Sequence, residues 1–500
     1  MSLVFRDAFW QIFWRLISAI AGFFVIKLVT PYLWPLRYWD YSTVLKYFAI
    51  WSALADFGIY VIALNSLGKI KDNTAKLLKY HKFLWFRFFM VFVVYATAFC
   101  IAYFIPSYTQ NIFIYHGLVI WMMFSAIFML AWIVQIPLQL NWKMKHVSIA
   151  LIIARIIQII WLIIIIYLIF PNVNFHIQSS QSLIAFLAVL VTVLLSWISQ
   201  FLYVLFVWNK YMKFKVNFDF SFIKLNIKQN WRYWVSYFLS SFHTLIVLIF
   251  LSILFPTSKW FIYVWIWSVA LALIEILLIV PSAFWNSIIH KISSYDKITK
   301  LKSLWYYLIF IIWVWFLVMF NFFIFKTQII NFVAWSKYLT NPNNIWSDSI
   351  LPFLSIVLFL SFIKQVFNYI LVSFNKQNTL FFVNLLWVII WIISWLLLIS
   401  KFNLYWWIVT QLLLEFCFVI WAIFVAKYYN ILPILNIKLL IKNFLLNIFY
   451  ILLVLFLFNI FNIYMFLNDS KIYFILVAMI VNTIYLIFSY KFIKNTVDNI

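Results

Sequence analysis

Long apolar stretches separated by short polar segments make up the chain. An α-helix needs about 20 apolar residues to cross the hydrocarbon layer of a membrane, and each stretch is of about that length. Fourteen spans are predicted, near residues 8–30, 43–66, 83–105, 112–139, 147–170, 182–208, 233–255, 260–288, 304–325, 348–373, 379–400, 404–426, 443–467 and 472–490. The pattern predicts an all-α, polytopic membrane protein with about fourteen transmembrane helices.

The polar segments divide this pattern into two lobes. Residues 1–208 form an N-terminal lobe of six helices, 209–230 a lysine-rich cytoplasmic linker, 231–426 a C-terminal lobe of six helices, and 427–500 two further helices with a cytoplasmic tail. A faint repeat relates the lobes, since Trp14-Arg15 recurs as Trp231-Arg232 and Asp56 as Glu275. Repeats of six helices have the same orientation in the membrane, and such a pair of lobes encloses a central cavity.

The positive charge follows the topology. The chain has 36 Lys and Arg against 11 Asp and Glu. Most of the basic residues fall in segments that are cytoplasmic if the N-terminus is inside. This bias predicts a multi-pass protein of the inner (cell) membrane with both termini in the cytoplasm. Anionic lipids are therefore the expected partners of the basic residues, and nucleic acid is not.

Known catalytic and cofactor motifs are missing from the sequence. Cys100 and Cys417 are far apart and inside predicted helices, and the six histidines have no metal-ligand spacing. No nucleotide-binding loop or hydrolase motif is found. We expect a protein that is not an enzyme, with no cofactor and no metal.

Four ionisable residues inside predicted helices could bind an anionic substrate. Arg15, Asp56, Arg155 and Lys364 are each predicted roughly 10–15 Å from the cytoplasmic surface, at ~1.5 Å per residue. Such residues are costly in a membrane, and Arg and Lys donate charge-assisted hydrogen bonds to phosphate. Arg15, Arg155 and Lys364 are therefore candidate diphosphate ligands. The alternative is structural: an Arg15–Asp56 ion pair, and long side chains that extend to the inner surface, as expected for Arg87.

Acidic residues in the membrane are candidates for ion coupling. Glu275 and Glu415 lie near the centres of two predicted helices of the C-terminal lobe. With Asp56, they could load and release H⁺ or Na⁺ during transport. The alternative for each glutamate is a protonated side chain that is hydrogen-bonded to a neighbouring helix.

The glycine and tryptophan contents are both unusual. The chain has 4 Gly and 29 Trp, whereas glycine averages about 7% of residues. Trp387, Trp391 and Trp395 recur at helical spacing in the middle of an apolar span, where membrane helices favour small residues. We hypothesise that many of these positions are glycine in the organism, as would follow if UGA codons read as glycine were translated as tryptophan. A genuinely Trp-rich membrane protein is the alternative.

One segment carries a family resemblance. Residues 33–58, LWPLRYWDYSTVLKYFAIWSALADFG, resemble the first loop and second helix of the oligosaccharide-lipid (O-antigen and polysaccharide) flippases once Trp34, Trp39 and Trp51 are replaced by glycine. Arg15 follows Trp14, which stands at another glycine of that family, and Ala55-Asp56-Phe57-Gly58 matches its second-helix signature. The flippases belong to the superfamily that also contains the multidrug and toxin exporters.

The resemblance implies a function as well as a fold. Members of this family move oligosaccharides linked to undecaprenyl diphosphate from the inner to the outer leaflet by alternating access, for cell-surface polysaccharide assembly. A polysaccharide polymerase and a ligase are then the expected partners. One alternative is an exporter of small cationic molecules, which would favour an acidic cavity. A second is a membrane glycosyltransferase or polysaccharide polymerase, which would need a large outer loop with an acidic pair.

Overall fold

The computed structural model describes most of the chain in atomic detail. The described residues are 3–56, 58–68, 72–141, 143–209, 217–254, 315–334, 347–374, 376–430, 437–460 and 471–498, with single positions at 70, 270, 273, 274, 301 and 312. Within these ranges all regular structure is helical, and the predicted all-α class is confirmed. The helices are α1 (Leu3–Asp56), α2 (Ile59–Gly68), α3 (Asn73–Tyr103), α4 (Pro106–Thr109), α5 (Ile112–Val134), α6 (Ile136–Leu140), α7 (Met144–Ile163), the π-helix η1 (Ile164–Ile169), α8 (Ser180–Trp208), α9 (Phe220–Leu254), α12 (Lys326–Ala334), α13 (Ser347–Ser373), α14 (Gln377–Tyr428), α15 (Ile437–Ile460) and α17 (Lys471–Asp498).

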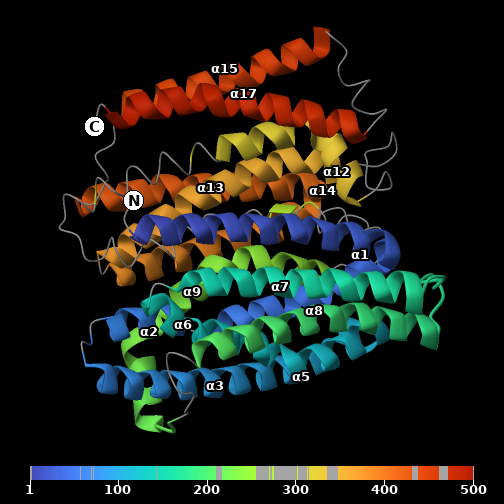
Figure 1. Cartoon of the computed structure of the whole chain (residues 1–500), viewed down its shortest axis with the longest axis vertical. Helices are drawn as coiled ribbons and strands as arrows, with labels where there is room; N and C mark the ends of the chain where they lie inside the picture. The colour runs from blue at the N-terminus through green and yellow to red at the C-terminus, as the bar shows by residue number, and fades with distance from the viewer. Residues whose placement is uncertain are drawn as a thin grey trace. The chain divides into compact units, whose positions relative to one another are not determined.

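The chain divides into two compact units. The first contains residues 1–268, 282–290 and 376–393, and the second contains 269–281, 291–375 and 394–500. In the first unit α1 packs against α3, α5, α7 and α9, and α8 packs against α5 and α7 (Figure 1). Gly117 of α5 permits part of this close packing, because a Cβ there would lie 3.0 Å from Val44 and 3.1 Å from Leu190. Among the described helices, α1, α3, α5, α7, α8 and α9 therefore form one bundle.

Four predicted spans are joined or broken differently in the structure. The spans at 8–30 and 43–66 meet in α1, which is kinked at Trp34, and the second span breaks after Asp56. Gly58 adopts a positive φ of 59° at this break, a conformation that glycine enters without a Cβ clash. Trp34 also has a positive φ, 57°, with ψ 165°. The predicted spans at 379–400 and 404–426 together form the single element α14.

The linker is partly helical and lies against the first unit. Its last described part begins α9 at Phe220, ahead of the predicted start at 233. Lys82 of α3 forms an ion pair of 2.7 Å with Asp219, and Phe83 packs edge-on against Phe222 with ring centroids 5.0 Å apart. The start of α9 is thus fixed to α3 by both charge and aromatic contact.

The second unit contains α12, α13, α15 and α17, together with residues 315–325. Asn321 and Asn482 of α17 exchange two side-chain hydrogen bonds of 2.7 and 2.9 Å. Tyr485 of α17 donates to Asn447 of α15 at 2.7 Å. Amide and hydroxyl pairs of this kind connect membrane helices whose remaining contacts are apolar.

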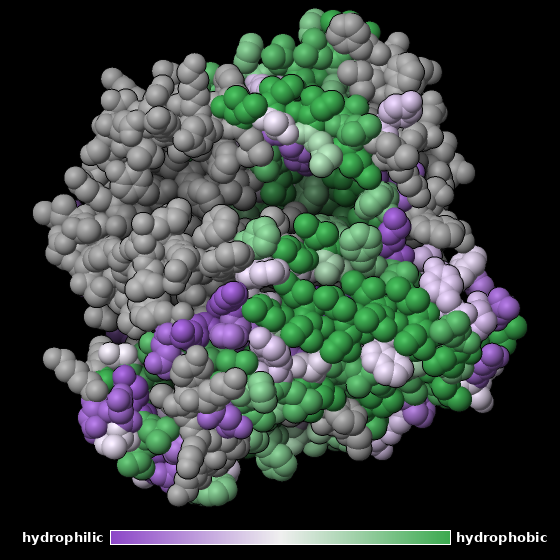
Figure 2. Space-filling model, viewed as in Figure 1, coloured by the Kyte–Doolittle hydropathy of each residue, from purple (hydrophilic) through white to green (hydrophobic). Residues whose placement is uncertain are grey.

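Apolar side chains cover the outside of the helices. In the part of the chain that is described, five helices are long and apolar enough to span a membrane, and a bent pair at Trp315–Ile324 and Lys326–Val333 would make a sixth. On the face shown in Figure 2, hydrophobic residues form a continuous area over the first unit with polar residues at both ends. Cys100 of α3 and Cys417 of α14 are both free and exposed. This surface is that of a polytopic membrane protein.

Candidate functional site

A buried ion pair lies in the second unit and joins two of the predicted site residues. Nζ of Lys364, on α13, is 3.4 Å from Oε1 of Glu415, on α14, and the two side chains are 5% and 0% exposed. The same ammonium group lies 5.0 Å from the ring centroid of Phe418, one turn beyond Glu415. Phe418 shares a helix face with Glu415 because residues at i and i+3 are neighbours. Lys364 thus contacts a carboxylate and an aromatic ring on the same face of α14.

Asp56 lies in the first unit, at the end of α1, and its partner is Arg87 of α3. Nη2 of Arg87 is 2.8 Å from Oδ1 of Asp56, and Nη1 donates to the carbonyl oxygens of Ala55 and Asp56 at 3.1 and 2.8 Å. Nε donates to the carbonyl of Met129 in α5 at 3.2 Å. Because the last carbonyls of a helix lack intrahelical donors, the guanidinium both caps α1 and pairs with its final carboxylate.

The expectation that Arg87 extends to the inner surface is wrong. The side chain is 1% exposed and points into the bundle. Hydropathy along the sequence gives the approximate depth of a residue but not the direction in which its side chain points. A usable signal was present, because glycine at position 58 indicates a helix break, which leaves carbonyl groups that need a donor, and an arginine in the adjacent helix can supply one.

Arg155 of α7 lies in a different part of the first unit. Its Nη1 donates to Oε1 of Gln158 at 2.8 Å, and its charge interacts with the phenol of Tyr41 in α1. Tyr41 and Asp56 are separated in α1 by about 22 Å, at ~1.5 Å per residue. Arg155 and Asp56 therefore do not share one layer, contrary to the sequence prediction. In the described part of the chain Arg155 has no carboxylate partner.

Arg15 and Glu275, the two remaining predicted site residues, are outside the part of the chain whose side chains are described. The backbone of Arg15 lies in α1. Among the predicted site residues whose side chains are described, Lys364 and Glu415 are the two that the structure brings together.

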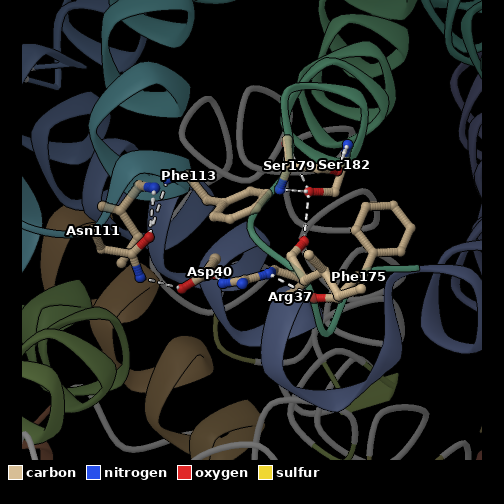
Figure 3. Close-up of polar contacts among 9 residues, drawn as sticks. Arg37, Asp40, Asn111, Phe113, Phe175, Ser179 and Ser182 are labelled. Atoms are coloured by element: carbon tan, nitrogen blue, oxygen red, sulfur yellow. Dashed lines mark hydrogen bonds and ion pairs between the residues drawn. The ribbon is translucent and has the colours of Figure 1, made fainter. Parts of the chain in front are cut away.

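A second polar network, absent from the sequence prediction, is buried in the first unit (Figure 3). Nη1 of Arg37 is 2.9 Å from Oδ2 of Asp40, and Nε donates to the carbonyl of Phe175 at 3.2 Å. Asn111 donates to Oδ1 of Asp40 at 2.8 Å, while its own Oδ1 caps the start of α5. The guanidinium carbon of Arg37 lies 3.7 Å from the ring centroid of Phe113. The network joins the kinked part of α1 to α5 and to the segment before α8.

Asp40 lies between the predicted spans at 8–30 and 43–66, outside the predicted membrane-spanning segments. Burial raises the pKa of its carboxyl group to about 6, since the opposing effects of Arg37 and Asn111 are smaller. At neutral pH the carboxylate is ionised and the ion pair with Arg37 is intact. Because all of its polar contacts are within the unit, we interpret this network as structural.

No family model matches the sequence, and no curated protein is similar to it in sequence. The structure is similar to that of the lipid II flippase MurJ in an inward closed conformation, with a TM-score of 0.61, 16% identity, and coverage of 97% of this chain and 99% of MurJ.

Multidrug transporters have the same architecture. The MATE multidrug transporter DinF-BH, in complex with R6G, is similar over 87% of this chain and 97% of its own length, with a TM-score of 0.63 and 14% identity. An inward-facing MATE transporter of the MOP superfamily is similar over 82% of this chain and 97% of its own length, with a TM-score of 0.55 and 10% identity. The chain therefore has the fold shared by these transporters of the MOP superfamily.

Proposed function

We propose that this protein moves oligosaccharides linked to a polyprenyl diphosphate from the inner to the outer leaflet of the cell membrane by alternating access. The observation that carries the proposal is the extent of the likeness to MurJ. It covers 97% of this chain, so it must include most of residues 427–500, the segment that follows the two predicted lobes. The DinF-BH likeness covers 87%. The chain-long match supports the proposal of a flippase of lipid-linked substrates, and the likeness to DinF-BH leaves a small-molecule exporter as the alternative.

The charged residues suit this substrate. A diphosphate needs cationic hydrogen-bond donors, which Arg15, Arg155 and Lys364 would supply in the membrane. Arg155 is the best placed of the described cations, because it lacks a carboxylate partner there. Glu415, Asp56 and Glu275 would couple transport to H⁺ or Na⁺. Asp56 pairs with Arg87 and Glu415 pairs with Lys364. Glu415 is the stronger candidate because its partner is itself a proposed diphosphate ligand.

The setting of the proposed activity follows from the charge distribution. With the basic segments in the cytoplasm, both termini are inside, and substrate is loaded from the inner leaflet of the cell membrane. Oligosaccharide delivered to the outer leaflet is the substrate of a polymerase and a ligase, which would be the functional partners. The lipid tail would stay in the bilayer while the diphosphate crosses the membrane.

A reconstituted flipping assay tests the proposal. Full-length protein in vesicles containing a fluorescent undecaprenyl-diphosphate oligosaccharide should move the lipid to the leaflet accessible to a quencher. Arg15→Ala and Lys364→Ala should each slow flipping about tenfold or more, since losing a charge-assisted hydrogen bond costs about 1.5–3 kcal/mol. Lys427→Ala, at the last turn of α14, is the matched control and should keep the wild-type rate.

The same vesicles distinguish the alternatives. Accumulation of a cationic dye without movement of the lipid would favour a drug exporter. Equal flipping rates in wild type, Arg15→Ala and Lys364→Ala would remove the diphosphate ligands from the proposal.

A further inference from the structure

We propose that the start of α9, residues 220–234, together with the residues just before it, forms a binding surface for anionic phospholipids of the inner leaflet. This surface is independent of the proposed transport activity, because it concerns the lipids around the protein and not the molecule that is carried. The direction of this part of α9, the residues that it exposes and its balance of charge all support the surface.

The start of α9 is held at two points of the first unit. At its beginning, the ring centroid of Phe220 lies 5.6 Å from that of Trp85 and 5.9 Å from that of Phe89, both in α3. Fourteen residues later, the indole of Trp234 donates to the carbonyl oxygen of Leu54 in α1 at 2.9 Å. This part of α9 therefore passes from α3 to α1.

Both points lie at the same depth along α3, a helix that is long and apolar enough to cross a membrane. Leu54 is two residues before Asp56, which pairs with Arg87 of α3. Arg87 stands between Trp85 and Phe89 in the sequence. About 20 Å of helix, at ~1.5 Å per residue, thus joins two points that are level with the same turns of α3. In Figure 1 the beginning of α9 crosses the end of α3. A helix so placed lies along the membrane surface.

The exposed face of this surface helix carries both apolar and basic side chains. Its large apolar residues that are exposed are Phe220, Leu225 and Trp231. Its cations are also exposed and recur at every fourth position: Lys224, Lys228 and Arg232. Residues four apart lie on one side of a helix, so the three cations form a row. Ile223 and Asn226 are buried. A basic and apolar exposed face of this kind is typical of helices that lie among lipid headgroups.

The residues before the helix extend its apolar edge onto α3. Phe218 is 70% exposed and packs edge-on against Trp85 with ring centroids 4.4 Å apart. Trp85 and Phe89 share one side of α3 with Phe92, which is exposed in the apolar part of that helix. Phe218 and Phe220 therefore connect the lipid-facing side of α3 to the row of cations. Aromatic rings at this level commonly anchor membrane proteins at the interface.

The charge of the segment favours an anionic ligand. Residues 217–234 contain three basic residues and one acidic residue, Asp219. The carboxylate of Asp219 forms an ion pair of 2.7 Å with Lys82 of α3, so the negative charge serves to fix the segment to the bundle. Lys and Arg donate charge-assisted hydrogen bonds to phosphate. A soluble anion would suit the cations alone, whereas an anionic phospholipid also supplies acyl chains for the aromatic edge.

Photocrosslinking of the full-length protein tests this surface. The protein is reconstituted in phosphatidylcholine vesicles that contain a trace of photoreactive phosphatidylglycerol or of the matching photoreactive phosphatidylcholine. Labelled peptides are then identified by mass spectrometry. In the wild type, the phosphatidylglycerol probe should label residues 217–234 about fivefold more than the phosphatidylcholine probe does. Salt at about 0.5 M should remove most of this difference, because it screens exposed charges.

Two paired variants separate the row of cations from positive charge in general. Lys224→Gln with Lys228→Gln should bring the ratio of labelling by the two probes close to that of equal binding. Lys143→Gln with Lys427→Gln is the matched control, since it removes the same charge from two other exposed lysines in segments that are predicted to be cytoplasmic. The control should keep the wild-type ratio.

The wild-type measurement decides the inference without any variant. Equal labelling of residues 217–234 by the two probes would overturn it, and so would the absence of labelling by either probe, because the face would then not contact lipid. A phosphatidylglycerol preference that survives in Lys224→Gln with Lys228→Gln would also overturn it, since other residues would then bind the headgroup. These results are separate from transport, which the flipping assay measures.

Discussion

At the scale of single residues, Trp34 has a backbone conformation that belongs to glycine. Its φ of 57° and ψ of 165° lie close to a region that is populated almost entirely by glycine, and other residues there carry a cost of roughly 1–3 kcal/mol. Asn430 also has a positive φ, but asparagine tolerates it. The ring of Trp34 is 39% exposed and contacts His176 edge-on, with ring centroids 4.7 Å apart.

We therefore predict that residue 34 is glycine in the protein made by its own organism. The peptide containing this position, analysed by tandem mass spectrometry, should have the mass of the glycine form. In recombinant protein, Trp34→Gly should raise the melting temperature by a few degrees, since the strain is relieved.

Trp315 is the control position for the melting-temperature measurement on Trp34→Gly. It is fully buried and stacks on Phe359 with ring centroids 5.3 Å apart, so Trp315→Gly should lower the melting temperature through the cavity it leaves. A tryptophan at position 34 in the native peptide would contradict the prediction.

At the scale of helices, the sequence predicted apolar spans well and their interruptions poorly. The period and length of apolar runs depend on single residues and are visible in the sequence. The break at Gly58, the kink at Trp34 and the early start of α9 depend on partners from other helices, such as Arg87 and Lys82. The same reason applies to the candidate site. Lys364 and Glu415 were each predicted from the sequence, but their contact depends on how α13 meets α14 and could not be predicted.

The Asp40 network makes the connection between α1 and α5 sensitive to pH. The folded protein holds a proton on Asp40 up to about pH 6, whereas an unperturbed aspartate loses it near 3.8. The free energy of unfolding should therefore fall as the pH rises through this interval. Melting temperatures at pH 4.5 and 7.5 should show this dependence in the wild type, and Asp40→Asn should reduce it.

Asp219 should have the opposite effect. Hydrogen bonds from Lys82, Ser221 and the Phe222 amide hold the pKa of its carboxyl group below its usual range. The stabilisation that ionised Asp219 gives to the folded protein is present above the ordinary aspartate pKa and is lost as the pH falls. Asp219→Asn should therefore selectively lower stability at neutral pH.

An unchanged pH dependence of the melting temperature in Asp40→Asn would show that Asp40 does not titrate between pH 4.5 and 7.5.

At the scale of the whole molecule, structural similarity was found where sequence similarity was not. Identities of 10–16% with the solved transporters are too low for a match by residue type, but the backbone arrangement persists. The sequence predicted the all-α class and the helical content, and residues 33–58 showed the resemblance to oligosaccharide-lipid flippases. The boundaries of the two compact units do not follow the ends of helices, because α14 contributes to both units.

The two exposed cysteines have a practical consequence. Cys100 belongs to one unit and Cys417 to the other, and they are the chain's entire complement of 2 Cys. The unmodified protein can therefore carry one spin label on each unit without any engineered substitution. Pulsed dipolar spectroscopy should resolve more than one distance between the labels in the absence of substrate, and undecaprenyl diphosphate should shift the populations toward one of them. A single distance that does not respond to the lipid would argue against alternating access. The two native thiols thus allow the distance between the units to be followed during transport.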